Sequence, residues 1–248
     1  MLDQLVTSAS TFSGDVDRLF VVITLIVGVW FLAAEAMFFW LIFRFRARPG
    51  VPAQYVTGKE KHLKRWINIP HTLILVFDVI IIIAAIRVWV KIKQTLPPAD
   101  RVVKVTAQQW AWTFDDPGPD GKLGTHDDVR TTDEMHVEVG KTYHFELESK
   151  DVVHSFFVPA FRLKQDADPG RTYTGWFKAT KTGSYDILCA EICGIGHGVM
   201  GAKLVVDSPE SFATWQQAHA VEPSADASTE TPAEGASGAV SALVPRGQ

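Results

Sequence analysis

The chain has 248 residues, a formal net charge of −4 and a mean hydropathy of +0.08. A slightly acidic balance gives no reason to expect a nucleic-acid partner. The near-zero hydropathy hides an uneven distribution, because the apolar residues are concentrated before residue 91, in two runs too long for an ordinary core helix.

The two apolar runs predict two membrane spans. Residues 19–43 form a run of about 25 residues, interrupted by Glu35, and residues 67–90 form a second run that contains Asp78. A signal peptide is excluded for the first run by its length, the acids in front of it and the lack of a small-x-small cleavage site. The length of the second run argues against a buried core helix.

The segment between the spans predicts their orientation. It carries one acid, Glu60, and the segment before the first span has one cation, Arg18. The positive-inside rule therefore places the connecting loop in the cytoplasm and both termini outside. The loop's cations are Arg44, Arg46, Arg48, Lys59, Lys61, Lys64 and Arg65.

From residue 102 to 206 the pattern changes to short segments rich in β-branched and aromatic residues, separated by Gly, Pro and Asp. This spacing predicts about seven strands in a β-sandwich or Greek-key barrel. A short helix with a Ser cap is expected at 208–220. The predicted strand segments are RVVKVTAQQWAWTF, MHVEVG, TYHFELES, HSFFVP, TYTGWF, GSYDIL and GAKLVVD.

Four regions follow from these patterns. They are an outer N-terminal segment at 1–18, two spans with a basic cytoplasmic loop at 19–92, an extracytoplasmic β-domain at 93–220, and a tail at 221–248. The tail is rich in Ala, Ser, Pro and Glu and is expected to be disordered. Its LVPRG stretch resembles a protease-cleavage sequence and is given no functional weight.

Both cysteines lie in the stretch CAEICGIGHGVM, which spans 189–200. A disulfide between them would close a very short loop and leave the other polar residues without a role. A zinc site would need a second pair of cysteines, and a thioredoxin-like redox pair is C-x-x-C, not C-x-x-x-C.

Copper fits this stretch better, because thiolate, imidazole and thioether are the ligands of cupredoxin electron-transfer sites. A mononuclear site uses one cysteine, whereas this loop has two, and His154 lies upstream. Two thiolates suggest two copper ions that share both sulfurs. The expected fold is therefore a two-helix transmembrane hairpin joined to an all-β, cupredoxin-like Greek-key sandwich.

With these residues the chain resembles subunit II of the haem–copper cytochrome c oxidases, over about residues 16–215. The resemblance implies a dinuclear copper (CuA) site held by the two thiolates, two imidazoles, a thioether and one backbone carbonyl. It also implies that the Glu191 side chain contacts a magnesium ion at the interface with subunit I. The implied copper ligands are His154, Cys189, Glu191 through its carbonyl, Cys193, His197 and Met200.

The stretch QQWAW resembles the family's aromatic segment, which implies that Trp110 receives electrons from a c-type cytochrome. The alternative is that Trp110 and Trp112 alternate on a strand and one of them belongs to the core. Acids near this segment are expected to attract the basic face of the donor. The candidates are Asp115, Asp116 and Asp151.

Two stretches depart from the family. The acid that helps form the mouth of the family's proton path is replaced here by Leu63, with Glu60 or His62 as substitutes. The segment 115–128 is close to a calcium-binding loop, with Asp116, Asp120 and Asp127 as ligands. An acidic hairpin and a docking surface for the donor are also compatible with this segment.

The resemblance implies a subunit of a proton-pumping oxidase in a bacterial inner membrane, with its copper domain in the periplasm. This subunit would pass electrons to haem in subunit I, where oxygen is reduced to water. The intact Cys, His and Met set argues against a quinol oxidase subunit II. A nitrous-oxide reductase carries a similar copper loop, but usually on a soluble chain with a large catalytic domain, which argues against that class. A membrane-tethered copper carrier outside an oxidase and a disulfide-bonded assembly subunit are also compatible with parts of the sequence.

Overall fold

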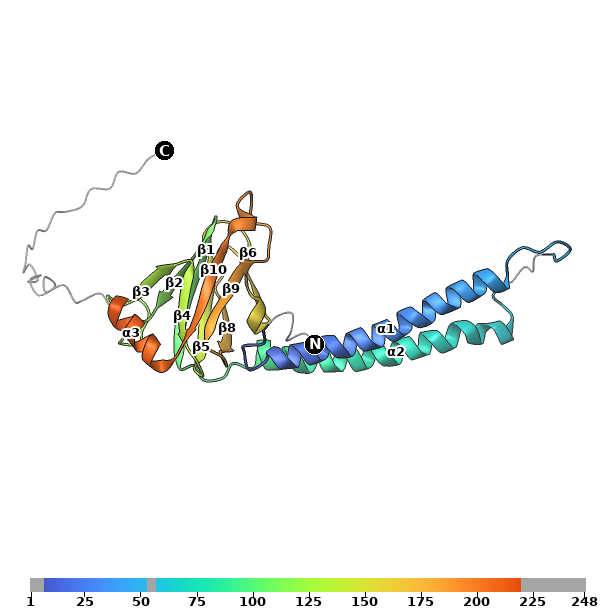
Figure 1. Cartoon of the computed structure of the whole chain (residues 1–248), viewed down its shortest axis with the longest axis horizontal. Coiled ribbons are helices and arrows are strands. Elements are labelled where there is room, and N and C mark those ends of the chain that lie inside the picture. The colour runs from blue at the N-terminus through green and yellow to red at the C-terminus, as the bar shows by residue number, and fades with distance from the viewer. Residues whose placement is uncertain (1–6, 53–56, 220–248) are drawn as a thin grey trace, which may run out of the picture.

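The structure is a computed structural model that describes residues 7–52 and 57–219. A long helical hairpin projects from one end of a β-domain (Figure 1). Its helices are α1 (Ser13–Arg44) and α2 (Lys61–Trp89), and a π-helical turn, η2 (Val90–Gln94), continues α2. Both helices are long and apolar enough to cross a membrane. The predicted 221–248 tail lies outside the described residues.

The hairpin is apolar on its outside, as expected for helices that face lipid. In each helix, no residue of the most hydrophobic segment is buried by the rest of the described chain. One contact between the two helices joins Trp30 and Phe77, whose rings meet edge to face with centroids 6.1 Å apart. Most of the hairpin surface is therefore available to lipid or to other subunits.

The β-domain is a sandwich of two five-stranded sheets. The first sheet has the strand order β3-β2-β1-β5-β8 and the second β4-β10-β9-β6-β7. Pairing is antiparallel except for β1 with β5 and β10 with β4, which are parallel. The strands are β1 (Arg101–Gln108), β2 (Ala111–Asp116), β3 (Val129–Thr132), β4 (Glu134–Glu138), β5 (Thr142–Ser149), β6 (His154–Val158), β7 (Leu163–Ala167), β8 (Tyr173–Lys178), β9 (Gly183–Cys189) and β10 (Gly201–Asp207).

Alternating apolar residues from both sheets fill the space between them. Trp112, Phe145, Phe156 and Phe177 are fully buried there. The helix α3 (Pro209–His219) packs on β4 and β10 at the end away from the hairpin, where the Trp215 ring stacks on His136 with centroids 4.5 Å apart. The fold thus matches the predicted hairpin plus β-sandwich.

The segment before α1 is part of the β-domain. Ala9 and Phe12 are fully buried, and the backbone N–H of Ala9 donates to the carbonyl of Ala160 at 2.9 Å. Ser10 forms an isolated β-bridge with Ala179 in the turn after β8. We call residues 9–12 the N-terminal strap, because they tie the start of the first span to the sandwich.

Candidate metal centre

The 189–200 loop links two adjacent strands of the second sheet. Cys189 ends β9, and β10 begins one residue after Met200. The Cys189 N–H donates to the Met200 carbonyl at 3.2 Å, so the two ends of the loop are held together. His154 begins β6, which pairs with β9 and brings the ring beside Cys189. Strand pairing therefore gathers residues 35 positions apart.

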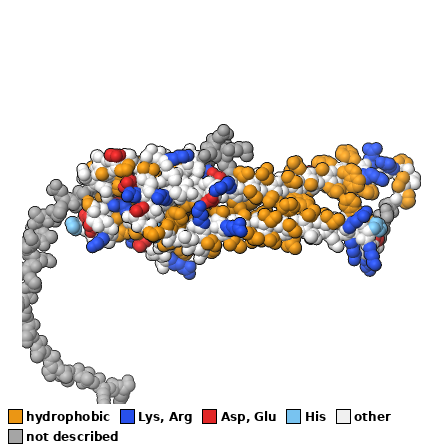
Figure 2. Space-filling model, turned by 90° about the horizontal axis from the view of Figure 1, so that it is seen from below, with side chains coloured by type: hydrophobic (Ala, Val, Ile, Leu, Met, Phe, Trp, Pro, Cys, Tyr) orange, Lys and Arg blue, Asp and Glu red, His pale blue; other side chains and the backbone are white. Residues whose placement is uncertain are grey.

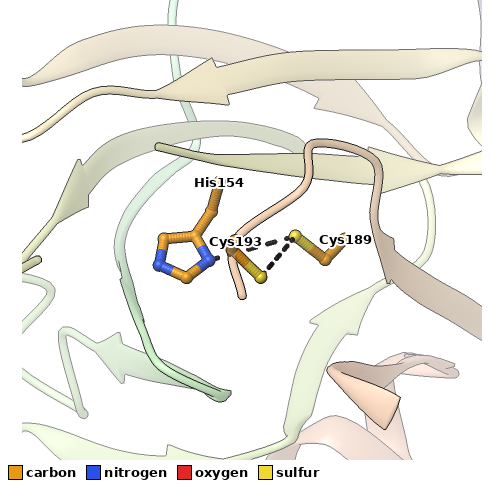
Figure 3. Close-up of side chains that lie close together, drawn as sticks. All are labelled: His154, Cys189 and Cys193. Carbon is orange, nitrogen blue, oxygen red and sulfur yellow. Dashed lines mark hydrogen bonds between the residues drawn. The ribbon is translucent and has the colours of Figure 1, made fainter. Parts of the chain in front are cut away.

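The predicted copper ligands converge within this loop. His154, Cys189 and Cys193 face one another (Figure 3), and their ligand atoms all lie within 4.8 Å. The sulfurs are 3.7 Å apart, and His154 Nδ1 lies 3.9 Å from the Cys189 sulfur. On the other side, His197 Nδ1 and Met200 Sδ lie 3.6 and 3.8 Å from the Cys193 sulfur. The Glu191 carbonyl is 3.3 Å from the Cys189 sulfur.

This arrangement fits a metal site better than a disulfide. Both cysteines are free, and their sulfurs are far beyond the bonding distance of about 2 Å. One imidazole nitrogen lies near each sulfur, and the Met200 thioether and the Glu191 carbonyl are the weaker donors beside them. Two thiolates, two imidazoles and a thioether form a soft donor set of the kind that selects copper.

A carboxylate behind the site orients one of the imidazoles. Asp151 Oδ1 lies 2.8 Å from His154 Nε2, and its other oxygen accepts the Gln109 N–H at 2.7 Å. Since a carboxylate accepts, His154 carries its proton on Nε2 and turns the lone pair of Nδ1 toward the sulfurs. Burial raises the pKa of Asp151, but these hydrogen bonds outweigh it and hold the pKa below its usual value. The sequence predicts a docking role for Asp151 and misses both this contact and Gln109.

Trp110 lies directly against the 189–200 loop. Its indole N–H donates to the Cys193 carbonyl at 3.2 Å, and the Gln109 side-chain amide donates to the same oxygen at 2.7 Å. A Cβ added to Gly196 would come within 2.3 Å of the Trp110 ring, so the glycine permits the close approach. The ring is 38% exposed, whereas Trp112 is fully buried in the core.

The two thiols differ in their surroundings. Cys193 is buried, and Cys189 is partly exposed. Burial, followed by the adjacent Cys189 thiol, raises the pKa of Cys193 to about 11. The chain without a metal therefore holds Cys193 as a protonated thiol at neutral pH, and metal binding must displace that proton.

The two acids at the end of β2 lie inside the β-domain. Asp115 and Asp116 are buried, and each is paired with an arginine. Arg130 Nε donates to Asp115 at 2.5 Å, and Arg101 Nε donates to Asp116 at 2.8 Å. Both carboxylates are held by their arginines, and the docking role of Asp115 and Asp116 stays a prediction.

The same pairing affects the predicted calcium ligands. Asp116 is already occupied by Arg101. Asp127 accepts the Asp120 N–H at 3.0 Å and the Thr125 hydroxyl at 2.7 Å, which closes a compact turn. These hydrogen bonds give the Asp127 carboxylate partners from within the turn. Calcium in the segment stays a prediction.

Leu63, the residue found where the resemblance leads us to expect an acid, lies in the first turn of α2. Leu63 lines an apolar cavity of about 840 Å³ between the helix ends, together with Trp40 and Trp66. Glu60, a suggested substitute for the missing acid, accepts a hydrogen bond from the Thr57 hydroxyl at 2.8 Å.

Comparison with known proteins places the chain among its relatives. Residues 117–208 match the family "Cytochrome C oxidase subunit II, periplasmic domain". The chain is 31% identical to "Alternative cytochrome c oxidase subunit 2" of Bradyrhizobium diazoefficiens, over 84% of this chain and 82% of that protein. It is 46% identical to "Cytochrome c oxidase subunit 2" of Thermostichus vulcanus, over 48% of this chain and 33% of that one.

A further relative and a solved structure complete the comparison. "Probable cytochrome c oxidase subunit 2" of Rickettsia bellii is 31% identical over 75% of this chain and 72% of that protein. A crystal structure of the periplasmic domain of subunit II of cytochrome oxidase of Bradyrhizobium japonicum covers 50% of this chain and 96% of its own at 31% identity, with a TM-score of 0.46. On the two sequence matches that cover most of both chains, the chain belongs to the family of cytochrome c oxidase subunit II, a subunit of the haem–copper oxidoreductases.

Proposed function

We propose that this chain is the electron-accepting subunit of a proton-pumping cytochrome c oxidase. It takes single electrons from a c-type cytochrome and delivers them to haem in subunit I, where oxygen is reduced to water. The observation that carries the proposal is the convergence of His154, Cys189 and Cys193, with His197 and Met200 completing the ring of donors. Family membership supports the oxidase as its assembly.

Two copper ions are proposed at this site, held by both thiolates, both imidazoles, Met200 and the Glu191 carbonyl. Copper in such a ligand set supplies a one-electron couple. The chain's own residues prepare the site: Asp151 fixes the His154 ring, and the hydrogen bond between Cys189 and Met200 closes the loop. The Glu191 side chain is exposed beside the loop, which leaves it available for the proposed magnesium ion at the subunit I interface.

The proposed donor surface is the exposed face of Trp110. The indole reaches the Cys193 carbonyl directly, so only one hydrogen bond separates this surface from the backbone of a ligand. Three apolar side chains at the loop tip, Ile192, Ile195 and Val199, are 77%, 95% and 85% exposed. Exposed apolar groups of this kind mark contact surfaces for other proteins.

The localisation is proposed from the hairpin and its charges. Two apolar helices anchor the chain in a bacterial inner membrane, and the basic connecting segment faces the cytoplasm. The β-domain and both termini then lie in the periplasm, where a soluble c-type cytochrome has access to Trp110.

The test is to load the full chain with copper in detergent, count copper per chain and record its electron paramagnetic resonance spectrum. Two ions with one unpaired electron split by two equivalent nuclei are expected. The loaded chain is then mixed with reduced cytochrome c, which should become oxidised. One copper with single-nucleus splitting would instead indicate a membrane-tethered blue-copper carrier, and no bound copper would leave a structural subunit.

A further inference from the structure

A cavity lies where the hairpin meets the β-domain, away from the copper site. Its volume is about 280 Å³. One wall comes from η2 and from the ends of α1 and α2 next to the β-domain. The other wall comes from Arg162 and the first two residues of β7. The lining residues are Leu19, Ala85, Val88, Trp89, Ile92, Lys93, Arg162, Leu163 and Lys164.

The lining residues from α1 and α2 are apolar, and the cations of the lining are Lys93 of η2 and Arg162 and Lys164 of the β-domain. Lys93 Nζ donates to two neutral oxygens, the Lys164 carbonyl at 3.0 Å and Gln165 Oε1 at 2.7 Å. Lys164 Nζ lies 2.8 Å from Asp166 and is about half exposed. The Lys93 ammonium thus brings a positive charge to the cavity, and the oxygens that accept its hydrogen bonds are neutral.

Positive charge exceeds negative charge around the whole joint. Figure 2 shows Lys and Arg side chains gathered where the apolar hairpin meets the β-domain. The carboxylates in the joint's ion pairs are Asp15, Asp17 and Asp166. They are outnumbered by the cations Arg18, Lys91, Lys93, Arg162 and Lys164.

With both helices in the bilayer, the cavity is at the depth of the lipid headgroups. The second span ends within η2, so residues Val88 and Trp89 approach the membrane surface. Tryptophan is enriched at this level, and lysine side chains extend from it toward the aqueous phase. An occupant must therefore combine a negatively charged head with an apolar tail that enters the bilayer.

We propose that this cavity binds an anionic phospholipid from the leaflet next to the β-domain. Its phosphate contacts the Lys93 and Lys164 ammonium groups, and the upper part of an acyl chain lies against Leu19 and Val88. The lipid then fills the joint between the membrane anchor and the β-domain. This site depends on neither the copper ligands nor the proposed electron transfer.

The test is native mass spectrometry of the full chain in detergent, titrated with phosphatidylglycerol or with zwitterionic phosphatidylcholine. Phosphatidylglycerol should bind more tightly. The double variant Lys93→Gln/Lys164→Gln should lose affinity for it by about tenfold or more, because each cation near a membrane surface contributes to the attraction of anionic lipid.

Two matched variants complete the design. Lys93→Arg/Lys164→Arg keeps both charges and should retain binding, which separates the lost charge from a folding defect. Lys122→Gln/Lys203→Gln removes the same charge from outside the cavity and should bind as the original chain does. Equal affinity for the two lipids, or an unchanged affinity in the Lys93→Gln/Lys164→Gln variant, would overturn the proposal.

Discussion

At the scale of single residues, Gly196 decides how closely the Trp110 ring packs on the 189–200 loop. A methyl group there meets the Trp110 ring at 2.3 Å, whereas a methyl group on Gly198 meets nothing within 4 Å. We expect Gly196→Ala to lower the free energy of unfolding by about 1–3 kcal/mol, because overpacking displaces the ring or the loop. It should also slow oxidation of reduced cytochrome c by the copper-loaded chain.

Gly198→Ala is the matched control, since it adds the same methyl group two residues away. Chemical denaturation of both variants in detergent gives the unfolding free energies, and rapid mixing gives the electron-transfer rates. If the two variants behave alike, the close packing of Trp110 on the loop does not matter for either property.

The Cys193 thiol makes a second residue-scale prediction. Its pKa in the folded chain without metal is raised to about 11, above that of an unfolded cysteine at about 8.5. This difference favours the folded state at neutral pH, and that contribution is lost as the pH rises through the interval between the two values. Copper uptake should correspondingly strengthen with pH, because a proton must leave.

Site-resolved alkylation by iodoacetamide, followed by peptide mass spectrometry, measures this pKa. The rate at Cys193 should keep rising to near pH 11 in the folded chain and level off near the ordinary thiol pKa in denaturant. The same midpoint in both states would show that burial and the neighbouring thiol do not perturb Cys193.

At the scale of elements, the N-terminal strap is a short segment that places one large aromatic side chain in the core of the β-domain. Phe12 is fully buried and its ring meets Trp176 edge to face, with centroids 5.4 Å apart. Phe12→Ala should destabilise the β-domain by about 3–5 kcal/mol, as expected for a buried aromatic side chain. Phe20→Ala, at a side chain 59% exposed on the lipid-facing hairpin, should have little effect on the same unfolding transition.

Thermal unfolding followed by circular dichroism compares the two phenylalanine variants. An unaltered transition in Phe12→Ala would mean that the strap packs on a domain that is already complete without it.

The elements also show how much the sequence can predict. The hairpin and the central strands follow from long apolar runs and clear alternation, and all the candidate metal-site residues except His154 lie in one compact motif. The sequence does not predict the strands β3 and β7, which both lie at sheet edges. Their segments, VRTT and LKQDA, carry polar or exposed residues, so they lack the alternating apolar signal of a half-buried strand.

Other features depend on contacts that only the folded chain brings together. The arginines that pair with Asp115 and Asp116 lie 15 positions from them in sequence, and Asp151 meets Gln109 across 42 positions. An isolated acid in a sequence does not reveal whether its partner is a cation, an imidazole or water. The sequence likewise predicts only an outer segment where the strap lies, because four residues are too short for a periodic signal.

At the scale of the whole molecule, the charge of the connecting segment should fix the orientation in the membrane. Trypsin should cleave the 44–65 segment in inside-out membrane vesicles and leave it intact in spheroplasts. Sites in the β-domain, such as Lys122 in its exposed turn, should show the opposite accessibility. Cleavage between the spans in spheroplasts would reverse the proposed topology.

The strap also has a consequence for the order in which the protein is made. Residues 9–12 are synthesised before either span, whereas their partners Ala160 and Ala179 are synthesised after both. The sandwich can therefore close only when the beginning of the chain has crossed to the side where the β-domain emerges. Two crossings keep the strap and the β-domain on the same side of the membrane, so a chain in which only one of the two helices crosses is left with an unfinished domain.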